Sequence, residues 1–172
     1  TPVTTLYSSL LQLVIADLAE ELGERKALAS LEKSLSQSAY YEQFLKAFSM
    51  GQDLAANIGK MQALIRQRGR PLSHQDIISG FNQAIVGLLR EEYQFLGFRT
   101  TRNTVQRMRA ALEKVPPNQR PLAQAISKFL QYYQNEDYLR GAKTAASTEV
   151  GVASETTKKR VQPLKLDGLS GS

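Results

Sequence analysis

The sequence contains no cysteine and a single histidine, His74, and these shortages exclude most kinds of catalytic centre. Without cysteine there can be no disulfide, no thiolate nucleophile and no cysteine zinc site. Histidine is the usual base near neutral pH. His74 follows Ser73 and precedes Asp76, a pattern typical of a helix start, so we expect it to be solvated rather than catalytic. We therefore predict no enzymatic activity.

Motifs for bound metals and cofactors are missing as well. Paired carboxylates do not recur at metal-binding helical spacing, and neither glycine-rich phosphate fingerprint occurs. One histidine without cysteine leaves zinc with too few ligands. We therefore expect neither a metal ion nor a cofactor.

Strand patterns are also absent, because nowhere do Val, Ile or Thr alternate over enough residues. Apolar residues instead recur at spacings of three and four, which predicts an all-α bundle of about six or seven helices in one domain, residues 1–140. Expected helix ends are Gly23, Gly97 and Pro116, and Ser73 and Pro121 mark expected helix starts. Segments 39–48 and 53–67 are expected to be one bent helix or two.

The two ends of the chain differ in character. Residues 1–21 are apolar, but they lack a basic n-region and are interrupted by Asp17, Glu20 and Glu21, so we expect a core helix of a cytoplasmic protein and no membrane contact. From Gly141 the residues are small, polar and aperiodic. This composition predicts a disordered basic tail over residues 141–172.

Positive charge is concentrated in the second half of the predicted bundle. The formal net charge is +6, and residues 60–140 have thirteen basic and six acidic residues, whereas residues 1–59 have four and seven. Segment 98–109 contains four arginines and no acid, namely Arg99, Arg102, Arg107 and Arg109. On a helix over 101–115, at about 100° per residue, Arg99, Arg102 and Arg109 share one stripe. Arg107 lies apart from that stripe and would broaden the basic face.

A second basic cluster comprises Arg66, Arg68 and Arg70, at an expected helix end. One or two cations there are explained by the helix dipole, three less easily. Both clusters favour arginine over lysine, which suits planar contacts with phosphate. We predict that the two clusters bind a nucleic-acid backbone, DNA or RNA, with little sequence preference. The alternatives for the first cluster are a solvated face and ion pairs with the acidic first half of the chain.

A small, basic, all-helical, cysteine-free chain without a catalytic centre resembles the small subunits of CRISPR effector complexes. The resemblance covers roughly residues 4–140 and is one of size, charge and helical class. It implies a non-catalytic subunit of an antiviral complex that stabilises guide RNA and target or displaced DNA, alongside other subunits and copies of itself. The alternative is a helical adaptor or assembly module whose basic face docks on an acidic protein.

Overall fold

The computed structural model describes residues 2–67, 69 and 71–145, and they form an all-α bundle, as the sequence predicts. Within this part of the chain there are seven α-helices, three 3-10 helices and no strand. The α-helices are α1 (Pro2–Leu22), α2 (Glu24–Ser36), α3 (Leu54–Arg66), α4 (His74–Leu96), α5 (Phe98–Leu112), α6 (Arg120–Gln131) and α7 (Glu136–Leu139). The 3-10 helices are η1 (Leu45–Ala47), η2 (Pro117–Gln119) and η3 (Tyr132–Gln134).

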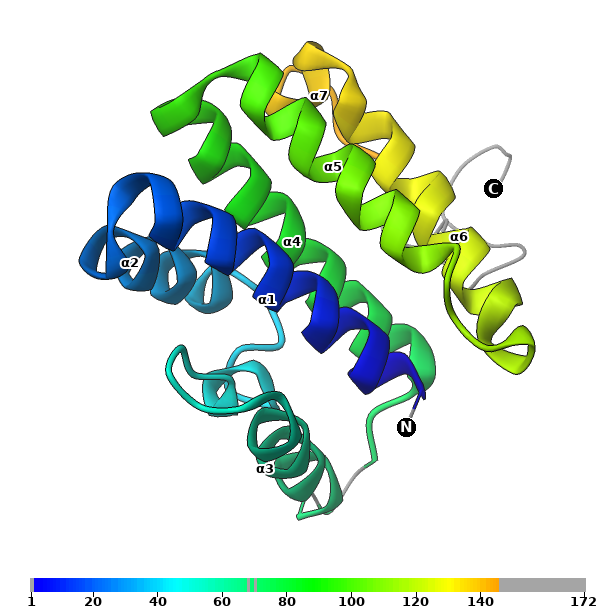
Figure 1. Ribbon diagram of the computed structural model, residues 1–172. Helices are drawn as coiled ribbons and strands as arrows, with labels where there is room; N and C mark the ends of the chain where they lie inside the picture. Colours follow the sequence, from blue (N-terminus) through cyan, green and yellow to red (C-terminus); the bar gives the residue numbers. More distant parts are fainter. Residues whose placement is uncertain (1, 68, 70, 146–172) are drawn as a thin grey trace, which may run out of the picture.

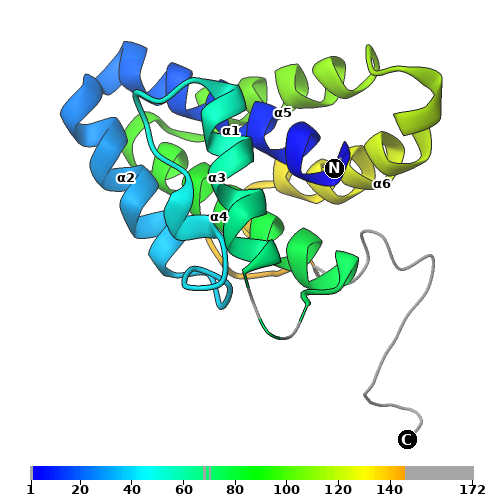
Figure 2. The ribbon, with the colours of Figure 1, turned by 90° about the horizontal axis from the view of Figure 1, so that it is seen from below.

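Helix α4 lies at the centre of the bundle (Figure 1). It packs against α1 and α2 on one side and against α5 on the other. Helix α3 packs on α1 and η1, whereas α6 packs on α5. The two views agree that α2 and α6 lie at opposite sides of the molecule (Figures 1 and 2). The face formed by α5 and α6 is therefore remote from α2.

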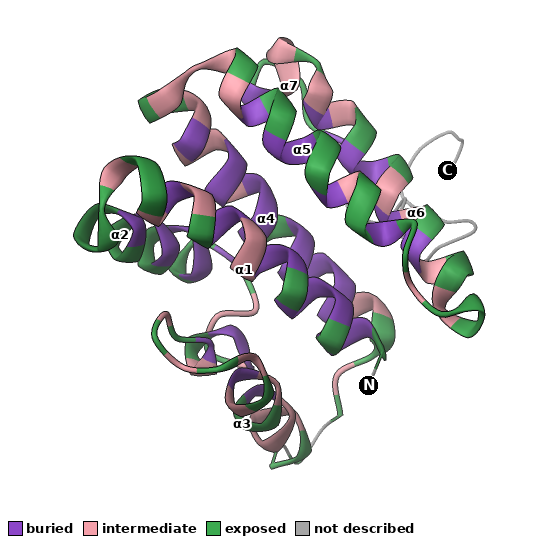
Figure 3. Cartoon of the chain, in the orientation of Figure 1, coloured by how far each residue is buried: buried purple, intermediate pink, exposed green. Residues whose placement is uncertain are grey.

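The core is centred on aromatic side chains that join three segments distant in sequence. The rings of Tyr7 and Phe81 stack with their centroids 5.0 Å apart, and Phe44 packs against Phe81 at 5.2 Å. All three side chains are fully buried. The Tyr7 hydroxyl donates a 2.8 Å hydrogen bond to Asn82 Oδ1, so its polar end is satisfied inside the core. Other buried residues lie along the inner faces of α1, α4 and α5 (Figure 3).

The expected helix boundaries are largely confirmed. Gly23 and Gly97 both adopt a φ of 89°, a left-handed conformation that favours glycine, and α1 and α4 end directly before them. Ser73 and Asp76 form a capping box, in which Ser73 Oγ accepts from the Asp76 N–H and the Asp76 carboxylate accepts from the Ser73 N–H. Pro121 lies in the first turn of α6.

The α-helix expected over residues 39–48 is wrong. Residues 37–44 form turns and continue into η1. Here the Ala39 N–H donates to Gln83 Oε1 at 2.8 Å, and Ser38 Oγ donates to the Gly80 carbonyl at 3.3 Å. These long-range hydrogen bonds to α4 replace the local ones that a helix would make. Helix α3 is separate, so residues 39–67 do not form one bent helix.

The two terminal predictions have different outcomes. Helix α1 has ten buried residues, so it is a core helix, as expected. By length and composition it is also apolar enough to cross a membrane, and it is the one such helix in the described residues. Of the expected tail, residues 141–145 are described, and Ala145 is buried. The rest, including Lys158, Lys159 and Arg160, lies outside the described residues.

Candidate nucleic-acid interface

The acid-free segment folds as α5, and its periodicity separates a buried side from a charged one. Val105, Met108 and Leu112 are buried against the bundle, as predicted. Arg99, Arg102, Asn103 and Gln106 are exposed. Helix α5 begins at Phe98, three residues before the predicted start, and so includes Arg99 in its first turn. The stripe of arginines therefore lies on one continuous helix, and from Arg99 to Arg109 it is about 15 Å long.

Arg99 and Arg102 are positioned to meet a ligand from solvent. Among the described residues neither guanidinium has an acidic partner within 4.0 Å. Together with Phe98, Asn103 and Gln106 they line a shallow hollow of about 350 Å³. The neutral amides beside the arginines can donate hydrogen bonds to phosphate or sugar oxygens.

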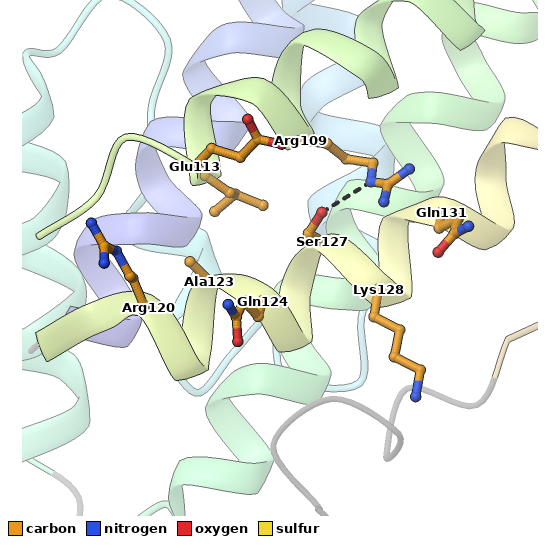
Figure 4. Close-up of a pocket in the computed structure, with 9 residues that line it drawn as sticks. Arg109, Glu113, Arg120, Ala123, Gln124, Ser127, Lys128 and Gln131 are labelled. Carbon is orange, nitrogen blue, oxygen red and sulfur yellow. Dashed lines mark hydrogen bonds between the residues drawn. The ribbon is translucent and has the colours of Figure 1, made fainter. Parts of the chain in front are cut away.

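Arg109 continues the stripe but is held in place by α6. Its Nε donates to Ser127 Oγ at 2.9 Å, and its Nη1 donates to Gln134 Oε1 at 2.7 Å. Both acceptors are neutral, so the hydrogen bonds fix the guanidinium plane without neutralising its charge. Figure 4 shows this guanidinium reaching from α5 towards Ser127.

Arg109 also borders a groove between α5 and α6, with a volume of about 520 Å³ (Figure 4). We call this the α5–α6 groove, and its lining residues are Arg109, Leu112, Glu113, Arg120, Ala123, Gln124, Ser127, Lys128 and Gln131. Three of them are cations and one is an acid. From residue 98 to residue 131 the chain has seven basic residues and one acidic residue, a net charge of +6 that equals that of the whole chain. Helices α5 and α6 are thus the electropositive part of the fold.

Arg107 does not belong to this surface. It lies on a different side of α5 and forms an ion pair with Asp17 of α1. For Arg107, therefore, the alternative prediction of an ion pair with the acidic first half of the chain is confirmed. The Arg107 side chain is half exposed, and its charge is neutralised where it meets the bundle. A role for Arg107 in broadening the basic face has no support in this geometry.

Of the second predicted cluster only Arg66 is described, and it does not lie with the first cluster. Arg66 is exposed at the last residue of α3, a helix that packs on α1 and η1. Arg68 and Arg70 lie outside the described residues. The interface that the structure assembles consequently comprises Arg99, Arg102 and Arg109, with Arg120 and Lys128 from α6. Arg120 and Lys128 could not be predicted as part of this interface, because they are well separated in the sequence from the arginines of α5. They join Arg109 only when α6 packs on α5.

Glu92 is a second site that the sequence analysis missed. Its side chain is fully buried in α4, and the Thr104 hydroxyl of α5 bridges it to the Asp17 carboxylate of α1. Thr104 Oγ1 lies 2.8 Å from Glu92 Oε2 and 3.1 Å from Asp17 Oδ2, while Glu92 Oε1 has no partner among the described residues. Burial raises the pKa of the Glu92 carboxyl to about 7, and the hydrogen bond with Thr104 opposes this rise. Glu92 follows Leu88 and Leu89 by four and three residues, which places it on the apolar face of α4. This spacing could have indicated from the sequence that Glu92 is buried.

Burial favours a neutral Glu92 carboxyl at the centre of the bundle. When Glu92 is protonated, its hydroxyl donates to Thr104 Oγ1, and the single Thr104 hydroxyl proton is then available for the Asp17 carboxylate. Arg107 compensates the Asp17 charge from the other side. Ionised Glu92 would compete with the Asp17 carboxylate and the Thr100 carbonyl for the one Thr104 hydroxyl proton. This arrangement is a structural junction of α1, α4 and α5, in which Glu92 and Thr104 are fully buried.

Chemical groups for catalysis are not assembled in the described part of the chain. His74 is exposed at the first residue of α4. The described residues contain no group of three or more His, Cys, Asp or Glu side chains that could hold a metal ion. The arrangement of α5 and α6 can bind an anion, and it presents no nucleophile paired with a base.

Comparisons with known proteins identify no relative from which a function could be transferred. No protein-family model, no curated protein and no solved structure matches the chain.

Proposed function

We propose that the face formed by α5 and α6 binds the sugar–phosphate backbone of nucleic acid and that the protein is a non-catalytic binding subunit. The observation that supports this best is the row of arginines on α5. Arg99 and Arg102 are exposed and have no acidic partner in the part of the chain that the structure describes, and Arg109 donates to the neutral acceptors Ser127 and Gln134. On helix surfaces unlike charges usually alternate, because like charges at such spacings repel each other.

Phosphate is the anion that this surface fits. Guanidinium groups bind phosphate oxygens through two parallel hydrogen bonds, and they lose less hydration than ammonium groups on binding. Contacts of this kind position a nucleic acid without reading its bases. The expected binding is therefore strongly salt-dependent and nearly independent of sequence.

The cellular setting that we propose is an antiviral complex. Helical class, size and basic charge resemble the small subunits of CRISPR effector complexes, which would place this protein in the cytoplasm beside guide RNA and target or displaced DNA. Its partners would be other subunits and further copies of itself. The competing proposal is an adaptor whose basic face docks on an acidic protein.

The test is the salt dependence of binding to fluorescently labelled oligonucleotides of several unrelated sequences. We expect a triple variant, Arg99→Gln, Arg102→Gln and Arg109→Gln, to lower affinity by a similar factor for every sequence. It should reduce the slope of log K against log salt by about two to three, because three phosphate contacts are removed. Melting of the variants by circular dichroism would show that the fold is retained.

A matched control removes the same charge elsewhere. Arg25, Lys46 and Lys60 are exposed cations on α2, η1 and α3, and their triple replacement with Gln changes the net charge equally. We expect the control variant to keep the wild-type slope. Equal slopes for the two triple variants would show that binding follows net charge and not the α5–α6 face. Loss of an acidic protein partner, with nucleic-acid affinity unchanged, would instead support the adaptor.

A further inference from the structure

The α5–α6 groove has a feature that phosphate binding does not require, namely an apolar floor. Leu112 and Ala123 form it, and they are 4% and 2% exposed. The groove around this floor is also lined by the cations Arg109, Arg120 and Lys128, the Ser127 hydroxyl and one acid, Glu113 (Figure 4). A ligand that suits the groove combines a negatively charged part with a compact apolar one.

We infer that the groove takes one unstacked base of a single-stranded nucleic acid, which stacks on Arg109, while the phosphates on either side of that base contact Arg120 and Lys128. This inference rests on the proposed function and narrows its ligand from any nucleic acid to a single strand. Duplex bases are held inside the stack, so a duplex could fill the groove only by flipping a nucleotide out, which costs a few kcal/mol. A single strand presents its bases without that cost.

The state of Arg109 supports a base as the occupant. Guanidinium planes stack on the faces of unpaired bases, and this is a common element of single-strand recognition. The plane of Arg109 is already fixed by the hydrogen bonds to Ser127 and Gln134, so little side-chain entropy remains to be lost on binding. Arg99 and Arg102 lie further along α5, where they can hold the phosphates of neighbouring nucleotides.

The side chains at the rim also predict a mild base preference. Gln124 and Gln131 line the groove, and an amide can both donate and accept a hydrogen bond at a base edge. An amide accommodates more than one pattern of donors and acceptors because it can rotate. The groove should therefore accept every base, with differences much smaller than those of a major-groove reader.

The test uses the full chain and three labelled ligands of about ten nucleotides each, a length within the range of single-strand sites. They are an oligothymidylate, a strand of equal length with abasic residues, and the duplex formed with oligoadenylate. The abasic strand keeps every phosphate and lacks only the bases. We expect it to bind about tenfold more weakly than the intact strand, which corresponds to about 1.4 kcal/mol. The duplex should also bind more weakly than the intact strand.

A protein variant examines the groove itself. Ala123→Leu adds carbon atoms to the floor without changing charge, and it should bring the affinities for intact and abasic strands together. The comparison of ligands on the unaltered protein does not depend on how this variant folds. Equal affinity of the wild type for intact and abasic strands, or tighter binding of the duplex, would overturn the inference and leave the proposed function standing. Failure of all three ligands to bind would overturn both.

Discussion

Replacing Glu92 with Gln gives a prediction whose size follows from the structure. The amide keeps the shape of the carboxyl group but cannot ionise. Because the Glu92 side chain is fully buried, its pKa is raised from 4.5 to about 7 in the folded protein. A rise of this size corresponds to about 3 kcal/mol of unfavourable free energy when the folded protein must hold the charged form.

The sign of the pH dependence follows from proton binding. Between about pH 4.5 and pH 7 the folded state keeps the Glu92 proton and the unfolded state has lost it, so stability falls as pH rises. This contribution to stability is present in full below about pH 4.5 and is lost as the pH reaches the folded pKa. From about pH 5 to about pH 8 the integrated loss of stability is about 2–3 kcal/mol. The Glu92→Gln variant lacks this loss, so it should gain stability relative to the wild type over that interval.

Urea denaturation followed by far-UV circular dichroism at the two pH values measures the effect. With an m-value of about 2 kcal/mol per molar, the midpoint of the variant relative to the wild type should shift by about 1 M between the two conditions. Glu113→Gln removes an exposed carboxylate of the same kind and controls for net charge. If the difference between variant and wild type were the same at both pH values, the burial argument for Glu92 would be refuted.

Two further predictions concern packing and pairing. Gly80→Ala should destabilise the fold by about 1–3 kcal/mol in chemical denaturation, because the added Cβ would lie 2.9 Å from Cζ of the buried Phe44 ring. Gly59→Ala should instead stabilise α3 by up to about 1 kcal/mol, because its added Cβ would have nothing within 4 Å. A gain in stability from both substitutions would contradict the packing of Phe44 on α4. Arg107→Gln should cost no more than about 1 kcal/mol, since the Arg107 side chain is half exposed, and it should leave the affinity for the labelled oligonucleotides unchanged; an effect as large as that of Arg99→Gln would place Arg107 in the interface.

The parts of the fold that the sequence predicts are those set by local chemistry. The ends of α1 and α4 follow from Gly23 and Gly97, and the start of α4 follows from the Ser73 and Asp76 box. The turns over residues 37–44 could not be predicted in this way, because their hydrogen-bond acceptors lie on α4. Residues 39–48 have the apolar spacing of a helix, but the hydrogen bonds of Ser38 and Ala39 to α4 determine their conformation instead.

The same division applies to the interface. Helical periodicity predicts which arginines of α5 share a stripe, and the structure confirms that stripe. It does not predict that Arg107 pairs with Asp17, or that Arg120 and Lys128 join Arg109, since those relations depend on how α1 and α6 pack against α5. Partner residues that are distant in the sequence thus decide which of the arginines remain available to a ligand.

The most direct measurement of the central claim is an NMR titration of arginine side-chain Nε–H signals with a short oligonucleotide. Each guanidinium reports separately, so the experiment locates the ligand as well as detecting it. Our account predicts shifts for Arg99, Arg102 and Arg109 that saturate together and diminish at high salt. Arg25 on α2 should stay unchanged. Shifts centred on α2, or none on α5 at saturating oligonucleotide, would contradict the assignment of the α5–α6 face as a nucleic-acid interface.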